Sequence, residues 1–193
     1  SGSEDLSGKL DDKIILLQDK IRYTTRGTEP EHRVMDVFAH VVMTTGKDGD
    51  VMTPSLSTQK GKVVVSLPKM DESAVQMKYG ISYISPEQAR FNYEHEAKDQ
   101  QLEELAANGR QVWETTLSQI QVEGGTESQR RTFYTSLYRT YERMVDINEY
   151  GQYYSGYDHE VHQSERPLYV DDWIWDTYLA QHPLRTILDP MTE

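Results

Sequence analysis

Residues 74–88 read AVQMKYGISYISPEQ, and the periodicity of the sequence changes inside this stretch. Up to residue 83, apolar and polar side chains alternate, which is the two-residue period of a β-strand with one apolar face. The following residues carry the signals of a helix start: Ser85 as the cap, Pro86 at the first helical position and Gln88 three residues after the cap. The chain therefore divides here into a strand-rich part and a helix-rich part, which is an α+β organisation.

The sequence before Ser85 predicts part of an antiparallel sandwich. Apolar runs and two-residue alternation predict earlier strands over residues 13–20, 33–44 and 62–67. Asp48-Gly49 is a hairpin signal, and the polar residues 1–12 read as a loose lead-in. We expect about four to six strands in this part. Their apolar faces need a partner sheet, which can lie outside this chain.

The sequence after Ser85 predicts helices. The first is expected to end at about Ala97, and the second carries apolar residues at a helical period from Leu102 to Ile120. Thr126 to Gln129 form another capping box. It opens a helix that is expected to end near Met144, and the Phe and Tyr stripe of this helix has the spacing of a packed face.

Two further segments complete the prediction. Residues 145–162 alternate glycine and tyrosine with polar residues, which indicates a hairpin or an ordered loop. The tyrosines of this segment, with Tyr150 and Tyr153 among them, either line a pocket or form a lid on neighbouring helices. Residues 173–189 are expected to form one helix that ends at Pro190.

The composition excludes several classes of protein. The chain has 193 residues, a net charge of -12 and only 36% hydrophobic residues, and its mean hydropathy is -0.74. This acidity argues against a nucleic-acid partner and against binding to anionic membranes. No apolar run reaches the ~20 residues of a membrane span. The absence of cysteine excludes disulfides and thiol chemistry. Because the chain has 13 tyrosines and 3 tryptophans, it is not a disordered acidic segment.

Residues 171–178 read DDWIWDTY and hold two of the three tryptophans beside three acidic residues. A flat aromatic ring can cover the apolar C–H face of a sugar, and a carboxylate can accept two hydroxyl protons. The same residues also have a purely structural interpretation. Trp173 and Trp175 could be core anchors, and Asp176 could be the N-cap of the helix that follows.

Four stretches, taken in order, resemble glycoside hydrolase family 92, the calcium-dependent exo-acting α-mannosidases. They are Tyr79–Ser85 with Glu87, Ala89 and Asn92; Trp113–Gly125; Phe133–Arg139 with Asp146, Gly151, Tyr153, Gly156 and Asp158; and Trp175–Tyr178 with His182, Pro183 and Leu184. The resemblance covers about residues 75–190, whereas residues 1–70 carry no such motif.

The resemblance implies an N-terminal β-sandwich, a helical linker and an (α/α)6 barrel. On this basis the chain is expected to be an internal fragment of a multidomain α+β protein. Residues 1–84 would be the end of the antiparallel sandwich, residues 85–125 the linker helices, and residues 126–193 the first helices of an incomplete catalytic barrel. The remainder of the polypeptide would then be its packing partner.

The resemblance also implies the activity: calcium-dependent hydrolysis of terminal α-linked mannose, in particular α-1,2-linked mannose, with inversion. The catalytic acid and base and the main calcium ligands are expected downstream of Glu193, so this fragment alone is expected to be inactive and no catalytic residue or metal ligand is assigned in it. Trp175 and Asp176 are the expected substrate-binding residues, with Tyr150 and Tyr153 as weaker candidates. The implied partner is a mannose-containing glycan, and the implied location is the periplasm, the cell surface or the exterior.

Two positions depart from the family pattern. Trp173 stands where the family often has a hydroxyl residue, so it either narrows the pocket entrance or packs. Leu179 stands where an arginine often follows the tyrosine, which removes a bidentate donor. Both departures bear on the preferred linkage.

Three other classes of function compete with the mannosidase. They are a non-catalytic carbohydrate-binding module, another (α/α)6 glycoside hydrolase or phosphorylase, and a polar interaction domain without a sugar ligand.

Overall fold

A computed structural model describes residues 5–22, 34–45, 49–59, 61–69 and 74–191. The chain forms two compact units, and each is described by itself. Unit 1 comprises Ser1–Gln101 and Gln152–Gln163, and unit 2 comprises Leu102–Gly151 and Ser164–Glu193. None of the helices in the described ranges has the length and apolar character needed to cross a membrane.

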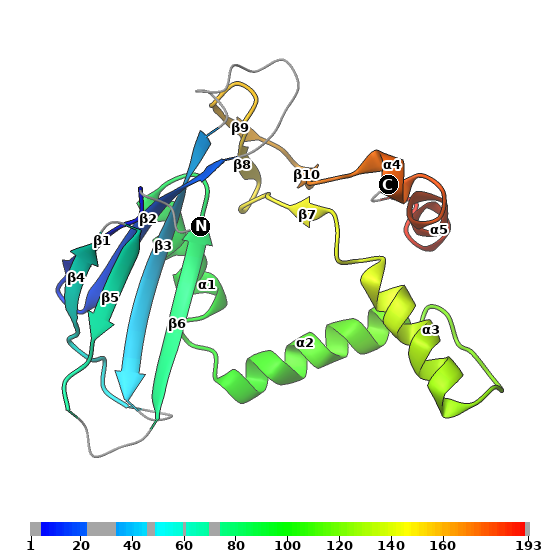
Figure 1. The fold of residues 1–193 in the computed structure, drawn as a ribbon, viewed down its shortest axis with the longest axis horizontal. Coiled ribbons are helices and arrows are strands. Elements are labelled where there is room, and N and C mark those ends of the chain that lie inside the picture. The colour runs from blue at the N-terminus through cyan, green and yellow to red at the C-terminus, as the bar shows by residue number, and fades with distance from the viewer. Residues whose placement is uncertain (1–4, 23–33, 46–48, 60, 70–73, 192–193) are drawn as a thin grey trace. The chain divides into compact units, whose positions relative to one another are not determined.

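Unit 1 is built on a four-stranded antiparallel sheet with the strand order β1-β2-β3-β6 (Figure 1). The strands are β1 Ser7–Asp11, β2 Ile14–Arg22, β3 Val34–Thr45 and β6 Val75–Ser82. A hairpin of β4 Ser55–Gln59 and β5 Lys62–Ser66 packs beside β1, where the Thr58 hydroxyl donates to the Gly8 carbonyl at 3.4 Å. The predicted strands before Ser85 are therefore confirmed, and all of these pairs are antiparallel.

The polar start of the chain was predicted wrongly as a lead-in. Residues 7–11 form β1, which pairs with β2 across a tight turn at Asp12, whose φ is 54°. An edge strand can carry polar residues on its exposed side, so composition alone did not reveal it. Of the predicted hairpin turn, Asp48 lies outside the described residues, but an isolated bridge joins Thr44 to Val51 on either side of it.

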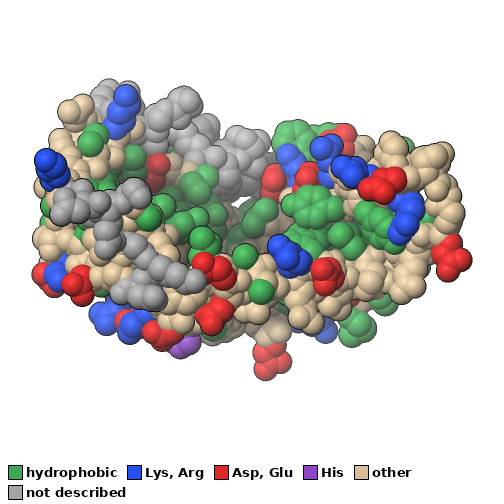
Figure 2. Space-filling view, turned by 90° about the horizontal axis from the view of Figure 1, so that it is seen from below, with side chains coloured by type: hydrophobic (Ala, Val, Ile, Leu, Met, Phe, Trp, Pro, Cys, Tyr) green, Lys and Arg blue, Asp and Glu red, His purple; other side chains and the backbone are tan. Residues whose placement is uncertain are grey.

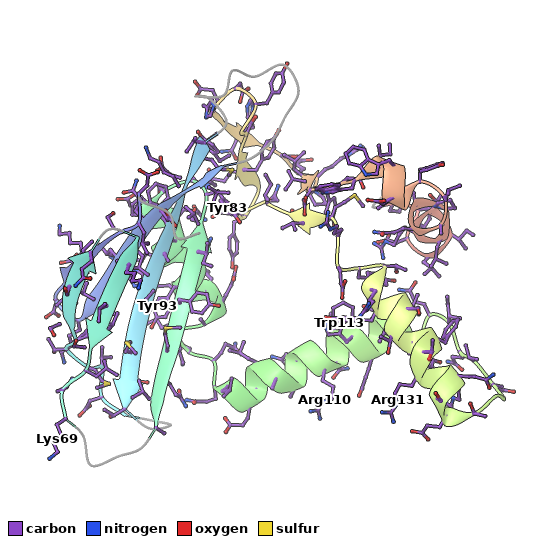
Figure 3. The ribbon with its side chains drawn as sticks, in the orientation of Figure 1. Lys69, Tyr83, Tyr93, Arg110, Trp113 and Arg131 are labelled. Atoms are coloured by element: carbon purple, nitrogen blue, oxygen red, sulfur yellow. The ribbon has the colours of Figure 1, made fainter. Side chains whose placement is uncertain are left out.

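Helix α1, Pro86–Glu96, covers one face of the sheet, and its predicted start is confirmed. The Ser85 hydroxyl oxygen accepts a hydrogen bond from the Gln88 backbone N–H at 3.1 Å. Tyr93 of this helix lies against the sheet (Figure 3), where its ring centroid is 5.0 Å from that of the buried His40. A Cβ added at Gly80 would lie 2.3 Å from the Ala89 carbonyl oxygen. The helix can therefore lie on the sheet only because residue 80 has no side chain.

The opposite face of β6 carries its apolar side chains, and they are exposed. Met77, Tyr79 and Ile81 are 57%, 49% and 46% exposed. The partner sheet that the sequence predicts for this face is not among the described residues. Hydrophobic side chains gather on the surface of both units in Figure 2, so each unit presents apolar surface that its own described residues do not cover.

A chain of side-chain amides fastens the hairpin of β8 Gln152–Tyr154 and β9 Val161–Gln163 to α1. The Asn92 amide donates to the Ile81 carbonyl at 2.8 Å, and the Gln88 amide donates to Asn92 Oδ1 at 2.9 Å. The Gln152 amide then donates to Gln88 Oε1 at 3.0 Å. The hairpin predicted within residues 145–162 is confirmed, and its anchor is this amide chain.

The buried His40 makes the stability of unit 1 dependent on pH. Burial lowers the pKa of the His40 imidazole, the nearby Arg90 lowers it further, and Glu94 opposes this in part. An unfolded histidine has a pKa of about 6.5. Below this pH, the unfolded chain therefore protonates the His40 imidazole more readily than the folded unit does. We expect the contribution of neutral His40 to stability to be fully present above this pH. The free energy of unfolding should then fall as the pH decreases from 7 to 5. The slope can reach about 1.4 kcal/mol per pH unit for one proton.

Urea unfolding at a series of pH values, with tyrosine fluorescence and circular dichroism as probes, measures this slope. His40→Leu is expected to reduce it, whereas His95→Gln, which removes an exposed histidine of the same unit, is the matched control. An unchanged slope in His40→Leu would show that other groups carry the pH dependence.

Unit 2 consists of helices and one short two-stranded ribbon. Its elements are α2 Leu102–Leu117, α3 Glu127–Arg139, β7 Val145–Asp146, β10 Tyr169–Val170, α4 Ile174–Thr177 and α5 Gln181–Leu188. The capping box at Thr126 is confirmed. Trp113 of α2, shown in Figure 3, packs against Tyr138 of α3, with their ring centroids 4.5 Å apart. The Arg185 guanidinium of α5 lies 4.1 Å from the centroid of the Tyr141 ring.

Two predicted helix boundaries in unit 2 were wrong. Helix α3 ends at Arg139 rather than near Met144, and the Thr140 hydroxyl caps the end by donating to the Leu137 carbonyl at 2.8 Å. The helix predicted over residues 173–189 is two helices, α4 and α5. Pro183 explains the break, because a proline is tolerated in the first turn of a helix but not in its interior.

Candidate functional site

The β7–β10 ribbon brings the two ends of the candidate site together. Val145 pairs with Val170 in antiparallel register, so the residues before β7 lie beside those after β10. Arg143 therefore meets Asp171, and its guanidinium nitrogen lies 3.7 Å from an Asp171 carboxylate oxygen. The chain then enters the single turn of α4, which carries Trp175 and Asp176.

Trp173 is held on three sides. Its indole N–H donates to Asp171 at 3.0 Å, and the Arg143 guanidinium lies 5.3 Å from its ring centroid. The Trp175 ring meets it edge to face, with centroids 5.2 Å apart and an interplanar angle of 75°. Trp175 itself is 64% exposed. The arrangement thus fixes one indole by packing and leaves most of the other open to solvent.

Asp176 follows directly after this open indole. Its side chain is exposed and makes no hydrogen bond or ion pair with any residue in the described part of the chain. Its backbone N–H donates to the Trp173 carbonyl at 2.7 Å, so it lies inside α4. The interpretation of Asp176 as the N-cap of a following helix is therefore wrong, because Trp173 is the N-cap of α4 and Ala180 is the N-cap of α5. Trp173 is 44% exposed, so the described residues of this chain do not bury it as a core anchor.

The Asp172 carboxylate joins α4 to the start of α5. One of its oxygens accepts a hydrogen bond from the Thr177 hydroxyl at 2.9 Å. The other lies 3.2 Å from His182 Nε2, which must donate because an ionised carboxylate can only accept. Thr177 is 5% exposed. This set of three side chains, Asp172, Thr177 and His182, is called the carboxylate clamp below.

The two candidate tyrosines fall in different units. Tyr150 is 53% exposed at a turn of unit 2, with a φ of 54°. Asn148 holds this turn, because its side-chain oxygen accepts from the Gly151 N–H at 2.9 Å. Tyr153 belongs to unit 1, where its ring stacks on His162 with centroids 5.4 Å apart. The structure thus groups Tyr150 with Trp175 and Asp176 in one unit, whereas one face of Tyr153 is occupied by His162.

The described residues contain no cluster of side chains placed as metal ligands. Among the acidic residues, Asp158 has its pKa lowered by hydrogen bonds from Ser155, the Glu160 backbone N–H and His162. This favours its ionised form over the protonated form that a general acid needs. Within the described ranges, no group of three or more His, Asp or Glu side chains is placed to hold a metal ion. These ranges therefore contain no carboxylate cluster of the kind that supplies much of the oxygen coordination of a calcium ion.

Sequence reasoning missed Arg143 and the carboxylate clamp. Arg143 reaches Asp171 only through the β7–β10 pairing, and strands of two residues give no recognisable period. Asp172, Thr177 and His182 are spaced by five residues, which matches neither a helix nor a strand. The signal that was available is the pair of adjacent carboxylates at residues 171–172, both of which turn out to accept hydrogen bonds.

Comparison with known proteins gives a consistent result. The model of the glycosyl hydrolase family 92 catalytic domain matches residues 88–193. A search of curated proteins found no match. Among solved structures, the chain is similar to a family GH92 inverting mannosidase from Bacteroides thetaiotaomicron VPI-5482, with 26% identity and a TM-score of 0.62 over 89% of this chain and 24% of that one.

Two further structures share the fold at 20% identity. A family GH92 α-mannosidase from Bacteroides thetaiotaomicron has a TM-score of 0.68 over 93% of this chain and 25% of that one. A GH92-family glycosyl hydrolase, ccman5, has a TM-score of 0.72 over 96% of this chain and 25% of that one. The chain thus spans about a quarter of the length of the structures that it resembles.

Proposed function

Because this chain belongs to glycosyl hydrolase family 92, we propose that it is part of an enzyme that removes terminal α-linked mannose, in particular α-1,2-linked mannose. The reaction would be a calcium-dependent hydrolysis with inversion at the anomeric carbon. The solved structure with 26% identity is described as an inverting mannosidase, which supports the reaction type. A mannose-containing glycan would be the partner, and the enzyme would work in the periplasm, at the cell surface or outside the cell.

The architecture of the proposed enzyme follows from the same similarity. The antiparallel sheet of unit 1 would be one side of a β-sandwich, since the apolar face of β6 is exposed and needs a second sheet. Helix α2 would be a linker helix, because none of its described residues is buried. Helices α3, α4 and α5 of unit 2 would open an (α/α)6 barrel that the remainder of the polypeptide completes.

The observation that carries the proposal is the exposed indole of Trp175 beside the solvated carboxylate of Asp176. The indole would cover the apolar face of the terminal mannose, and Asp176 would accept protons from its hydroxyl groups. A hydrogen bond to a charged group is worth about 1.5–3 kcal/mol. Tyr150 would act as a further contact from the same unit.

An inverting reaction needs two carboxyl groups roughly 6.5–9.5 Å apart, one to protonate the leaving oxygen and one to activate water. These groups would lie in the remainder of the polypeptide. Calcium would be held there as well, by oxygen ligands. The described residues of this chain contain no group of three or more His, Asp or Glu side chains placed for it. In this proposal the chain binds and orients the terminal sugar and supplies no acid or base.

Mannose release by the complete polypeptide tests the proposal. We expect α-1,2-mannobiose to be hydrolysed to mannose, and we expect a calcium chelator to abolish the release and added calcium to restore it. Nuclear magnetic resonance of the first product formed would show the inverted β-anomer. The control is the same protein with a gluco-configured disaccharide.

Three other results would redirect the assignment. Binding of mannose without turnover, in a protein shown to be folded, would favour a carbohydrate-binding module. Dependence on inorganic phosphate would favour a phosphorylase. Hydrolysis that persists in the chelator would remove calcium from the proposal and leave the glycosidase.

A further inference from the structure

We infer that Asp172 is a positioning residue, which fixes the turn that carries Trp175 and Asp176 through the carboxylate clamp. The inference rests on the proposed function of that turn as the mannose-binding element. Its basis is that the two oxygens of one carboxylate contact two helices. One contacts Thr177 in α4 at 2.9 Å, and the other contacts His182 in α5 at 3.2 Å.

Helix α4 needs such an anchor because it is very short. It has four residues, and no side chain caps its N-terminus. An isolated helix of this length is not stable in water, since the conformational entropy lost in forming the first turn outweighs the stabilisation from its hydrogen bonds. The turn must therefore be held by contacts outside itself. Among the side chains of the four residues of α4, only the Thr177 hydroxyl donates a hydrogen bond to a carboxylate.

The clamp also determines where α4 points. Thr177 is buried at the end of the turn, and its hydroxyl lies within 3.3 Å of the Trp173 carbonyl in addition to its bond with Asp172. Asp176 precedes Thr177 directly, so a rotation of Thr177 would turn the Asp176 carboxylate with it. His182 provides the fixed end, because it lies in the first turn of the eight-residue helix α5. Asp172 thereby sets the direction of the sugar-binding side chains without touching the sugar.

Amide hydrogen exchange and steady-state kinetics of the complete polypeptide test this inference together. In Asp172→Ala we expect the amides of residues 176–178, which donate within α4, to exchange about tenfold faster. The KM for the mannoside should rise by about tenfold while kcat changes less, because the turn binds and orients the sugar and performs no proton transfer.

Thr177 offers a matched pair of variants. Thr177→Val keeps the shape and loses the hydroxyl, so it should reproduce the effect of Asp172→Ala, whereas Thr177→Ser keeps the donor and should restore the wild-type values. Glu114→Gln removes one negative charge from the exposed surface of α2 and is the control for charge. The double variant Asp172→Ala/Thr177→Val should be no worse than either single variant.

Each outcome decides one point. Equal exchange in Asp172→Ala and wild type would overturn the clamp. Faster exchange with an unchanged KM would overturn the positioning of the sugar-binding turn. A wild-type protein that neither binds nor cleaves a mannoside would overturn the proposed function, while the exchange measurement would still decide whether the clamp holds α4.

Discussion

Asp176→Ala is expected to lower kcat/KM for a mannoside by about 10- to 100-fold in the complete polypeptide. The reason is the loss of one charged hydrogen bond to a sugar hydroxyl, worth about 1.5–3 kcal/mol, since each 1.4 kcal/mol is roughly a factor of ten. Because the Asp176 side chain bonds to no residue in the described part of the chain, its removal should leave the melting temperature within about 1–2 °C of wild type. Steady-state kinetics and thermal unfolding measure the two quantities.

Two controls separate this effect from a general effect of charge. Asp176→Asn keeps the size and one acceptor oxygen, so its loss of kcat/KM should be smaller than that of alanine. Glu114→Gln removes a negative charge from the surface of α2 and should leave kcat/KM unchanged. Wild-type kcat/KM in Asp176→Ala would contradict the assignment of this carboxylate to the sugar.

Gly80→Ala is expected to lower the free energy of unfolding of unit 1 by about 2–3 kcal/mol, at the upper end of the usual cost of overpacking. The added methyl would lie 2.3 Å from the Ala89 carbonyl oxygen and 2.4 Å from the Tyr93 backbone nitrogen. Both atoms belong to the backbone of α1, so no side-chain rotation relieves the clash. The helix must move away from the sheet, and the His40–Tyr93 contact is lost with it.

The same substitution in α2 should have the opposite sign. A methyl at Gly109 meets no heavy atom of the described residues within 4 Å outside its own helix, so Gly109→Ala should stabilise α2 by about 0.5–1 kcal/mol. All three tryptophans lie in unit 2. In urea, Gly80→Ala should therefore shift the tyrosine and circular-dichroism transition of unit 1, and Gly109→Ala the tryptophan transition of unit 2. Equal shifts in both signals would contradict the steric explanation.

The parts of the fold that depend on local sequence were predictable. The caps at Ser85 and Thr126 act over three residues, and the alternation of β6 is visible in a single segment. Strand β1 was not predictable in the same way, because its residues become a strand only by pairing with β2. The break between α4 and α5 could have been expected from Pro183, which outweighs the apolar pattern on either side.

The candidate site also combines features that depend on local sequence with features that depend on long-range pairing. Trp175 and Asp176 are adjacent in sequence, so an aromatic surface next to a carboxylate could be proposed from the pattern alone. Arg143 and Asp171 are far apart in sequence and meet through the β7–β10 ribbon. Tyr153 shared a segment with Tyr150, but the hairpin that carries it belongs to unit 1. Side chains that are adjacent in sequence could thus be predicted to act together, whereas contacts made through long-range strand pairing could not.

The return of residues 152–163 to unit 1 has a consequence for synthesis on the ribosome. When residue 101 has been translated, α1 is present but Gln88 still lacks the amide of Gln152. The hairpin is complete only 62 residues later (163 minus 101), which takes about 3 to 12 s at roughly 5–20 residues per second. During this interval the residues of α2 and α3 are synthesised. Much of the second unit of the nascent chain is therefore made before the first unit can be closed.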